Sequence, residues 1–153
     1  MVLRAIGFAK IPLLGLCSPR VRELNERRCV VSIPLRRMTK NHLGSMYFGA
    51  LSIGADCAGG MIAVEQIQKK FGRGGMKKVA LVFKDFQAEF HKRAEGEVHF
   101  TCEDGELISR MLEETLRTGE RVTEGVQVIA TVPRLSGNEP VATFKLGLSL
   151  KRR

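Results

Sequence analysis

Residues 41–70 read NHLGSMYFGALSIGADCAGGMIAVEQIQKK, and this stretch decides the fold. From Met46 to about Lys70 it contains no proline and is dense in alanine, glycine and other residues that a helix tolerates. Ser45 is a suitable N-cap, and the glycine-rich segment at 71–75 supplies the C-terminal stop. The stretch therefore predicts one long helix that begins near Ser45.

The predicted helix contains Gly49, Gly54, Gly59 and Gly60. Each glycine costs about 1 kcal/mol relative to alanine in a helix interior. The absence of a side chain lets another element approach the helix closely, which offsets that cost. We therefore expect a curved sheet, or a second helix, to pack almost directly against this helix, and a sheet that wraps it fits the composition best.

Extended runs with a two-residue period flank the helix on both sides. Before it, residues 20–35 read as two short strands around a turn at Asn25 and Glu26. After it, alternating apolar and polar residues predict four strands, at 86–90, 98–102, 126–132 and 141–153. Residues 105–119 have apolar side chains at helical spacing and predict a second helix, with a broken strand as the alternative. The pattern predicts an α+β fold with one long helix against an antiparallel sheet of about five to six strands.

The length of 153 residues suits a single domain, residues 1–153, in which residues 1–12 form an N-terminal arm or a short docking helix. No uninterrupted apolar run reaches the roughly 18 residues of a membrane-spanning helix, so no integral membrane segment is expected. The four cysteines contain no CxxC pair and the three histidines have no metal-ligand spacing. We expect a reduced, metal-free, cytoplasmic protein.

The formal net charge of +9 favours an anionic partner or simply keeps the protein in solution. Nucleic acid is not the expected partner, because the basic residues are dispersed and the chain has one tyrosine and no tryptophan for base stacking. A small molecule that carries phosphate groups, such as coenzyme A, can be bound by fewer basic residues than nucleic acid requires.

Asp56 is the residue that fits its surroundings least well. No other residue from Tyr47 to Ala63 is charged, and an unpaired buried carboxylate would cost several kcal/mol. The carboxylate is therefore solvated, paired, protonated or retained for chemistry; a side chain that points outward into water is the simple interpretation, and we favour a functional one. The loop at 41–45 has the polar and glycine content either of an ordinary helix cap or of a loop that presents backbone N–H groups to a carbonyl oxygen.

These residues resemble a motif of the hotdog-fold thioesterase superfamily, in particular thioesterases of the phenylacetate-pathway type. That motif has Asn, two residues, Gly, two residues, His-Gly-Gly, and then an Asp near the middle of the helix. The matching residues are Asn41, Gly44, Gly49 and Asp56, while Tyr47 and Phe48 stand where the His and the first Gly are usual. The whole phrase is most similar to a poorly characterised branch of the superfamily in which tyrosine is normal at position 47.

The resemblance implies a hotdog fold over residues 13–151 and an acyl-thioester hydrolase, with the acyl-CoA as substrate. It makes Asp56 the nucleophile, or the general base that activates water against the thioester carbonyl. Asn41 would orient the substrate or the water, and the backbone N–H groups of Phe48 and Gly49 would contact the oxyanion. Tyr47 would donate a hydrogen bond in place of the usual His.

Arg73, Lys77 and Lys78, or Lys92 and Arg93 in the next strand, are the candidates for binding the phosphates of coenzyme A, and an ordinary solvated basic surface is the alternative for each of them. Coenzyme A would enter only as part of the substrate, and no cofactor is expected. A non-catalytic protein that binds acyl thioesters or lipids in the same groove is the alternative function. A dehydratase is less favoured, because no histidine stands where that reaction usually has one.

Helix geometry adds a prediction about assembly. Phe48 and Asp56 are separated by about 12 Å along one helix, at roughly 1.5 Å per residue. They cannot both contact one carbonyl group. If both act, Asp56 of one chain must meet the helix start of a second chain, which requires an isologous homodimer, possibly arranged further as a tetramer.

Overall fold

The computed structural model describes residues 10–153, so residues 1–9 of the predicted N-terminal arm lie outside the described residues. Eleven elements follow one another along this part of the chain: α2 (Pro12–Cys17), β1 (Arg20–Leu24), β2 (Cys29–Ile33), α3 (Phe48–Phe71), η1 (Gly75–Lys77), β3 (Val79–Phe90), β4 (Val98–Cys102), α4 (Gly105–Thr118), β5 (Val122–Thr131), α5 (Pro133–Ser136) and β6 (Pro140–Arg152).

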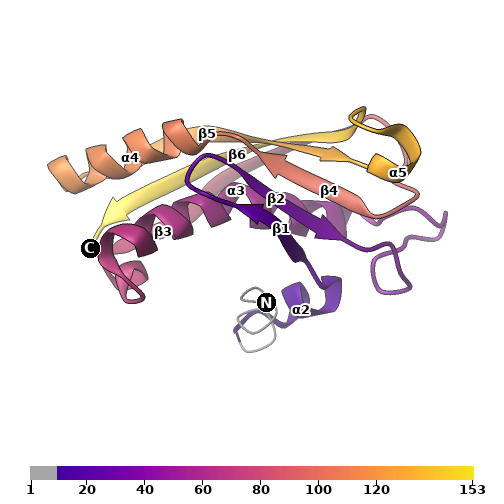
Figure 1. Cartoon of the computed structure of the whole chain (residues 1–153), viewed down its shortest axis with the longest axis horizontal. Helices are drawn as coiled ribbons and strands as arrows, with labels where there is room; N and C mark the ends of the chain where they lie inside the picture. The colour runs from indigo at the N-terminus through magenta and orange to yellow at the C-terminus, as the bar shows by residue number, and fades with distance from the viewer. Residues whose placement is uncertain (1–9) are drawn as a thin grey trace.

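The six strands form one sheet in the order β1-β2-β4-β5-β6-β3, and every neighbouring pair is antiparallel. Figure 1 shows the strands arching over α3, which runs along the inner face of the sheet. This arrangement confirms the predicted α+β hotdog fold, and the second helix expected at 105–119 is present as α4.

The sheet approaches α3 most closely at Gly54. The ring of Phe100 on β4 occupies the place where a Cβ atom at residue 54 would lie. At Gly59 the same added atom would be 3.5 Å from Val126 and Val128, which is an ordinary contact distance. The close packing expected from the glycine content is therefore confirmed, and Gly54 is the position that requires it most.

Gly54→Ala should destabilise the fold by about 2–3 kcal/mol, because the new methyl group overlaps the Phe100 ring and the core must shift. Gly59→Ala is the matched control and should stabilise the fold by up to about 1 kcal/mol, since alanine is the better helix former and space is available. Urea unfolding of both variants would measure the difference. A Gly54→Ala protein as stable as the Gly59→Ala protein would contradict the close contact.

The start of α3 differs from the prediction. The helix begins at Phe48 with Tyr47 as the N-cap residue, and no side chain caps it. Ser45 is not the N-cap, because its hydroxyl is bonded to the Asn41 side chain at 3.0 Å. The N–H groups of Met46 and Tyr47 donate to Ala94 O and Thr39 O, both at 2.8 Å. These bonds hold Met46 and Tyr47 outside the helix, with Tyr47 in an extended conformation, so the helix begins later than predicted.

Strand β3 lies at the edge of the sheet and carries an exposed apolar face. The pairing with β6 is irregular between Phe83 and Phe86, where β3 has one residue more than β6. The residues that point to one face of the sheet are therefore odd-numbered before this irregularity and even-numbered after it. Phe86 and Phe90 are apolar residues of the alternation at 86–90, a pattern typical of a strand with one buried face, yet they are 42% and 51% exposed in the single chain. A period of two residues indicates which side chains share a face, but it does not reveal that the strand lies at the edge.

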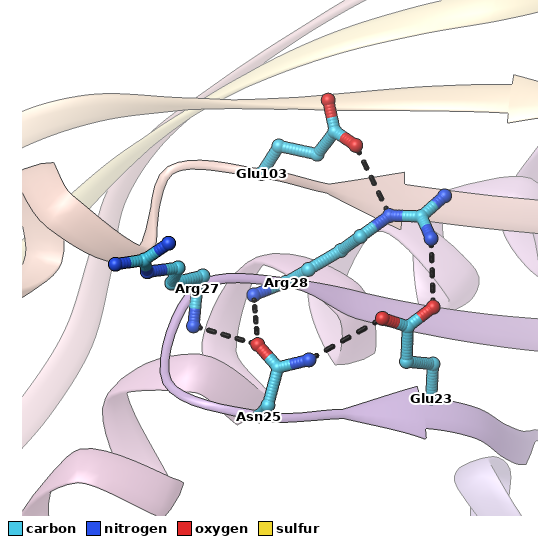
Figure 2. A network of polar contacts seen from close by, with 5 residues as sticks. All are labelled: Glu23, Asn25, Arg27, Arg28 and Glu103. Atoms are coloured by element: carbon cyan, nitrogen blue, oxygen red, sulfur yellow. Dashed lines mark hydrogen bonds and ion pairs between the residues drawn. The ribbon is translucent and has the colours of Figure 1, made fainter.

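The β1–β2 turn is held by side chains, as Figure 2 shows. The Asn25 carboxamide oxygen accepts the backbone N–H groups of Arg27 and Arg28, at 2.8 and 2.9 Å. The Arg28 guanidinium pairs with Glu23 at 2.7 Å and with Glu103, just after β4, at 3.0 Å. The turn predicted at residues 25 and 26 is confirmed, and the ion pairs connect it to the next strand of the sheet.

Within the described residues, α3 is the helix that by length and composition alone could cross a membrane. Of its most apolar window, 56% is buried inside the fold, which is the placement of a core helix. The four cysteines are free and buried. Burial raises the pKa of Cys29 and of Cys57 to about 12, and that of Cys102 to about 11.

Candidate active site

A cavity of about 540 Å³ opens beside the start of α3. Three segments line it: the loop at 41–46, the first turn of α3, and residues 90–94 at the end of β3 and beyond. Met46, Leu51 and Ala94 are buried, whereas Phe48 and Phe90 are exposed, with ring centroids 6.4 Å apart. The cavity therefore combines a buried apolar part with exposed aromatic rings.

The loop before α3 is organised by Asn41. Its carboxamide oxygen accepts the backbone N–H groups of Leu43 and Ser45, at 2.9 and 3.2 Å, and its nitrogen donates to the Ser45 hydroxyl. The backbone N–H of Asn41 also donates to Ser45 O at 2.8 Å. The Asn41 side chain is thus engaged inside its own loop. In this structure it fixes the path of the chain into α3.

The first helical hydrogen bond of α3 runs from the Leu51 N–H to Tyr47 O at 3.1 Å. Within residues 10–153, the N–H groups of Phe48, Gly49 and Ala50 have no hydrogen-bond acceptor. These donors lie at the positive end of a helix of 24 residues. The helix start can therefore stabilise a negatively charged oxygen.

Tyr47 and Phe48 stand beside these donors. Both side chains are about half exposed, and their ring centroids are 4.7 Å apart. The Tyr47 ring lies over Gly49, where an added Cβ atom would be 2.6 Å from Tyr47 Cε1. A side chain at position 49 would therefore require the half-exposed tyrosine ring to move.

Asp56 lines a second cavity, of about 290 Å³, together with Ser52, Ile53, Phe83, Phe86 and Leu146. It is the one charged residue of that lining, and within the described part of the chain its carboxylate has no hydrogen bond or ion pair. In the single chain the Asp56 side chain is exposed, as the simple interpretation from the sequence expects, and partial burial of its carboxyl group raises the pKa of Asp56 above its ordinary value. A raised pKa makes the Asp56 carboxylate a stronger base than an ordinary surface aspartate, which suits a group that accepts a proton.

The predicted site residues thus form two groups within one chain. Asn41, Tyr47 and Phe48 line the larger cavity, and Gly49 lies under the Tyr47 ring. Asp56 lines the other cavity, further along the same helix. The single chain therefore does not bring the carboxylate and the helix start to one point, in agreement with the distance calculated from helix geometry.

The basic residues expected to bind phosphate are also separated. Arg73, Lys77 and Lys78 lie at the far end of α3, roughly 35 Å from its start at about 1.5 Å per residue, and Lys78 Nζ is 5.0 Å from the Phe71 ring. Lys92 and Arg93 instead line the cavity at the helix start. Within one chain, Lys92 and Arg93 are therefore the basic residues that line the same cavity as the start of α3.

Several lining residues were not identified as site residues from sequence. In the sequence, Phe86 and Phe90 are apolar residues of an alternating strand, and nothing distinguishes Phe83 and Leu146 from residues of the core. Apolar residues that line a cavity and apolar residues that fill the core have the same composition and period. No signal in the sequence could have separated them.

A family model described as "Domain of unknown function (DUF4442)" matches residues 2–146. A search of curated proteins finds no match. Among solved structures, a protein from Pseudomonas aeruginosa, described as of unknown function and a probable thioesterase, aligns with a TM-score of 0.80 and 21% identity over 99% of this chain and 95% of that one.

A protein of unknown function from Chlorobaculum tepidum aligns with a TM-score of 0.79 and 12% identity, covering 99% of this chain and 93% of the other. A thioesterase from Haemophilus influenzae aligns with a TM-score of 0.69 and 12% identity, covering 99% and 88%. At these identities the likeness establishes the fold alone.

Proposed function

This chain belongs to the family described as Domain of unknown function (DUF4442), and from that premise we propose that it is an acyl-thioester hydrolase. The observation that carries the proposal is Asp56, a carboxylate with no charged partner in an apolar cavity on the central helix of a hotdog fold. The shared fold supports it, because similar solved structures include a protein described as a thioesterase. Acyl-CoA is the proposed substrate.

In the proposed reaction, Asp56 acts as a general base. It accepts a proton from a water molecule while the water oxygen bonds to the thioester carbonyl carbon. The carbonyl oxygen becomes an oxyanion, which accepts hydrogen bonds from the N–H groups of Phe48 and Gly49. The C–S bond then breaks, the thiolate leaves and takes up a proton, and the carboxylic acid is released.

The carboxylate and the N–H donors would come from two copies of the chain. The two cavities are separated along α3, so a second copy running in the opposite direction would place its helix start beside Asp56. The surface between them suits such contact, because Phe48, Phe86 and Phe90 are exposed and β3 is an open edge strand. We therefore propose a homodimer with two shared sites, which could pair further as a tetramer.

The test is a hydrolysis screen on acyl-CoA substrates with short, long and aromatic acyl groups, combined with sedimentation to determine the oligomeric state. Thiol release detected with a chromogenic reagent is expected for at least one class, from a dimer. Activity in a protein that stays monomeric at assay concentration would contradict the shared site.

A second function is favoured by one observation, the ring of Tyr47 over Gly49 beside the helix donors. If that ring prevents the carbonyl oxygen from reaching the Phe48 and Gly49 N–H groups, the protein binds acyl thioesters without cleaving them. Thermal-shift titration with the same substrates would then show saturable stabilisation without thiol release. Turnover that scales with enzyme concentration rules this function out.

A further inference from the structure

The cavity at the start of α3 has two chemically different parts. Its buried part is apolar, formed by Met46, Leu51 and Ala94, whereas His42, His91, Lys92 and Arg93 are exposed around it. Among the described residues, no aspartate or glutamate lines this cavity. The cavities near the start of α4 differ, because their linings mix acidic and basic side chains. The cavity beside α3 therefore suits a ligand with an apolar portion and an anionic portion.

The two cations of this cavity are not equivalent. Lys92 Nζ lies 2.7 Å from Glu139 Oε1, so a carboxylate already compensates its charge. Arg93 is exposed, and within residues 10–153 its side chain has no hydrogen bond and no ion pair. Arg93 is thus the available cation beside the helix start.

The backbone next to Arg93 is fixed relative to the helix. Ala94 O accepts the Met46 N–H at 2.8 Å, which joins this segment to the chain that enters α3. Arg93 is therefore carried on a backbone segment of defined position, at the same cavity as the start of α3. An arginine can form two parallel hydrogen bonds to a phosphate, a geometry that lysine cannot reproduce.

We propose that Arg93 binds a phosphate group of the thiol portion of the substrate, so that the cavity selects thioesters of phosphate-bearing thiols over phosphate-free ones. The inference rests on the proposed function for the thioester, but the phosphate contact is a separate claim. It assigns the contact to Arg93 in place of Arg73, Lys77 and Lys78, which lie at the other end of α3.

The test measures binding of free coenzyme A to the full chain by calorimetry, which does not depend on turnover. Arg93→Gln should weaken binding about tenfold, the loss of one charge-assisted contact. Arg93→Lys, which keeps the charge but not the paired geometry, should weaken it less. Arg110→Gln, an exposed arginine of α4 far from this cavity, is the matched control and should bind coenzyme A like the unaltered protein. Equal melting temperatures of the two glutamine variants would show that folding is unaffected.

A second measurement compares two substrates with the same acyl group, the acyl-CoA and the phosphate-free N-acetylcysteamine thioester. Arg93→Gln should raise KM about tenfold for the first and leave KM for the second unchanged. Unchanged coenzyme A affinity in Arg93→Gln would overturn the inference even if the protein hydrolyses thioesters. The inference would also fail if coenzyme A binding were weakened only in the combined Arg73→Gln, Lys77→Gln and Lys78→Gln variant. Loss of coenzyme A binding in Arg93→Gln, in a protein that hydrolyses nothing, would support the phosphate contact while the hydrolase proposal fails.

Discussion

Asp56→Asn should lower kcat/KM for acyl-thioester hydrolysis by about 10²–10⁴, the usual contribution of a general base. The amide has nearly the same shape as the carboxylate but cannot accept the proton of the attacking water. The rate of the unaltered protein should also fall as the pH drops through the raised pKa of Asp56, because protonation removes the same function. Initial rates of thiol release across a pH series would measure both effects.

Glu65→Gln is the matched control for this substitution. It removes a carboxylate from the same helix, but Glu65 faces Lys69 at 3.9 Å and does not line the Asp56 cavity. Its activity should equal that of the unaltered protein, and both variants should sediment as the unaltered protein does. An Asp56→Asn protein that retains full activity would refute the assignment of Asp56 as the base.

Phe48→Pro should lower kcat by about 10²–10³ relative to Phe48→Ala, because proline removes one backbone N–H of the proposed oxyanion site. Proline is well accepted at the first position of a helix, where the N–H has no helical partner. The preceding residue is also compatible, since Tyr47 has φ −62° and ψ 138°, in the extended region that a following proline requires. The two variants lack the same aromatic ring, so their difference isolates the N–H group.

Equal kcat values for the proline and alanine variants would show that the Phe48 N–H does not contact the oxyanion. Circular dichroism should give the same helix content for both. Mixing the Asp56→Asn and Phe48→Pro proteins provides a further check. In a dimer with shared sites, the mixed dimer contains one site with both groups intact and one site with neither, so exchange of subunits should restore activity that each protein lacks alone.

The sequence determined the long helix and the six strands. The long helix could be predicted because its residues include no proline and many alanines and glycines, whose small side chains allow other elements to pack closely. The strands could be predicted because alternating apolar and polar residues are typical of a sheet with one buried face. Asp56 could be selected as a candidate from sequence alone, since a single charge inside an apolar helix requires an explanation. These are properties of near neighbours along the chain.

The tertiary structure alone decided the remaining features. The helix begins at Phe48 and not near Ser45 because Ala94, from a distant segment, accepts the Met46 N–H. Phe86 and Phe90 are exposed because the order of strands puts β3 at the edge. Arg93 lies at the cavity, and Arg73 does not, because the fold and not the spacing brings residues 90–94 to the helix start. Local patterns determine which elements form, whereas contacts between residues far apart in sequence determine where those elements end and what they surround.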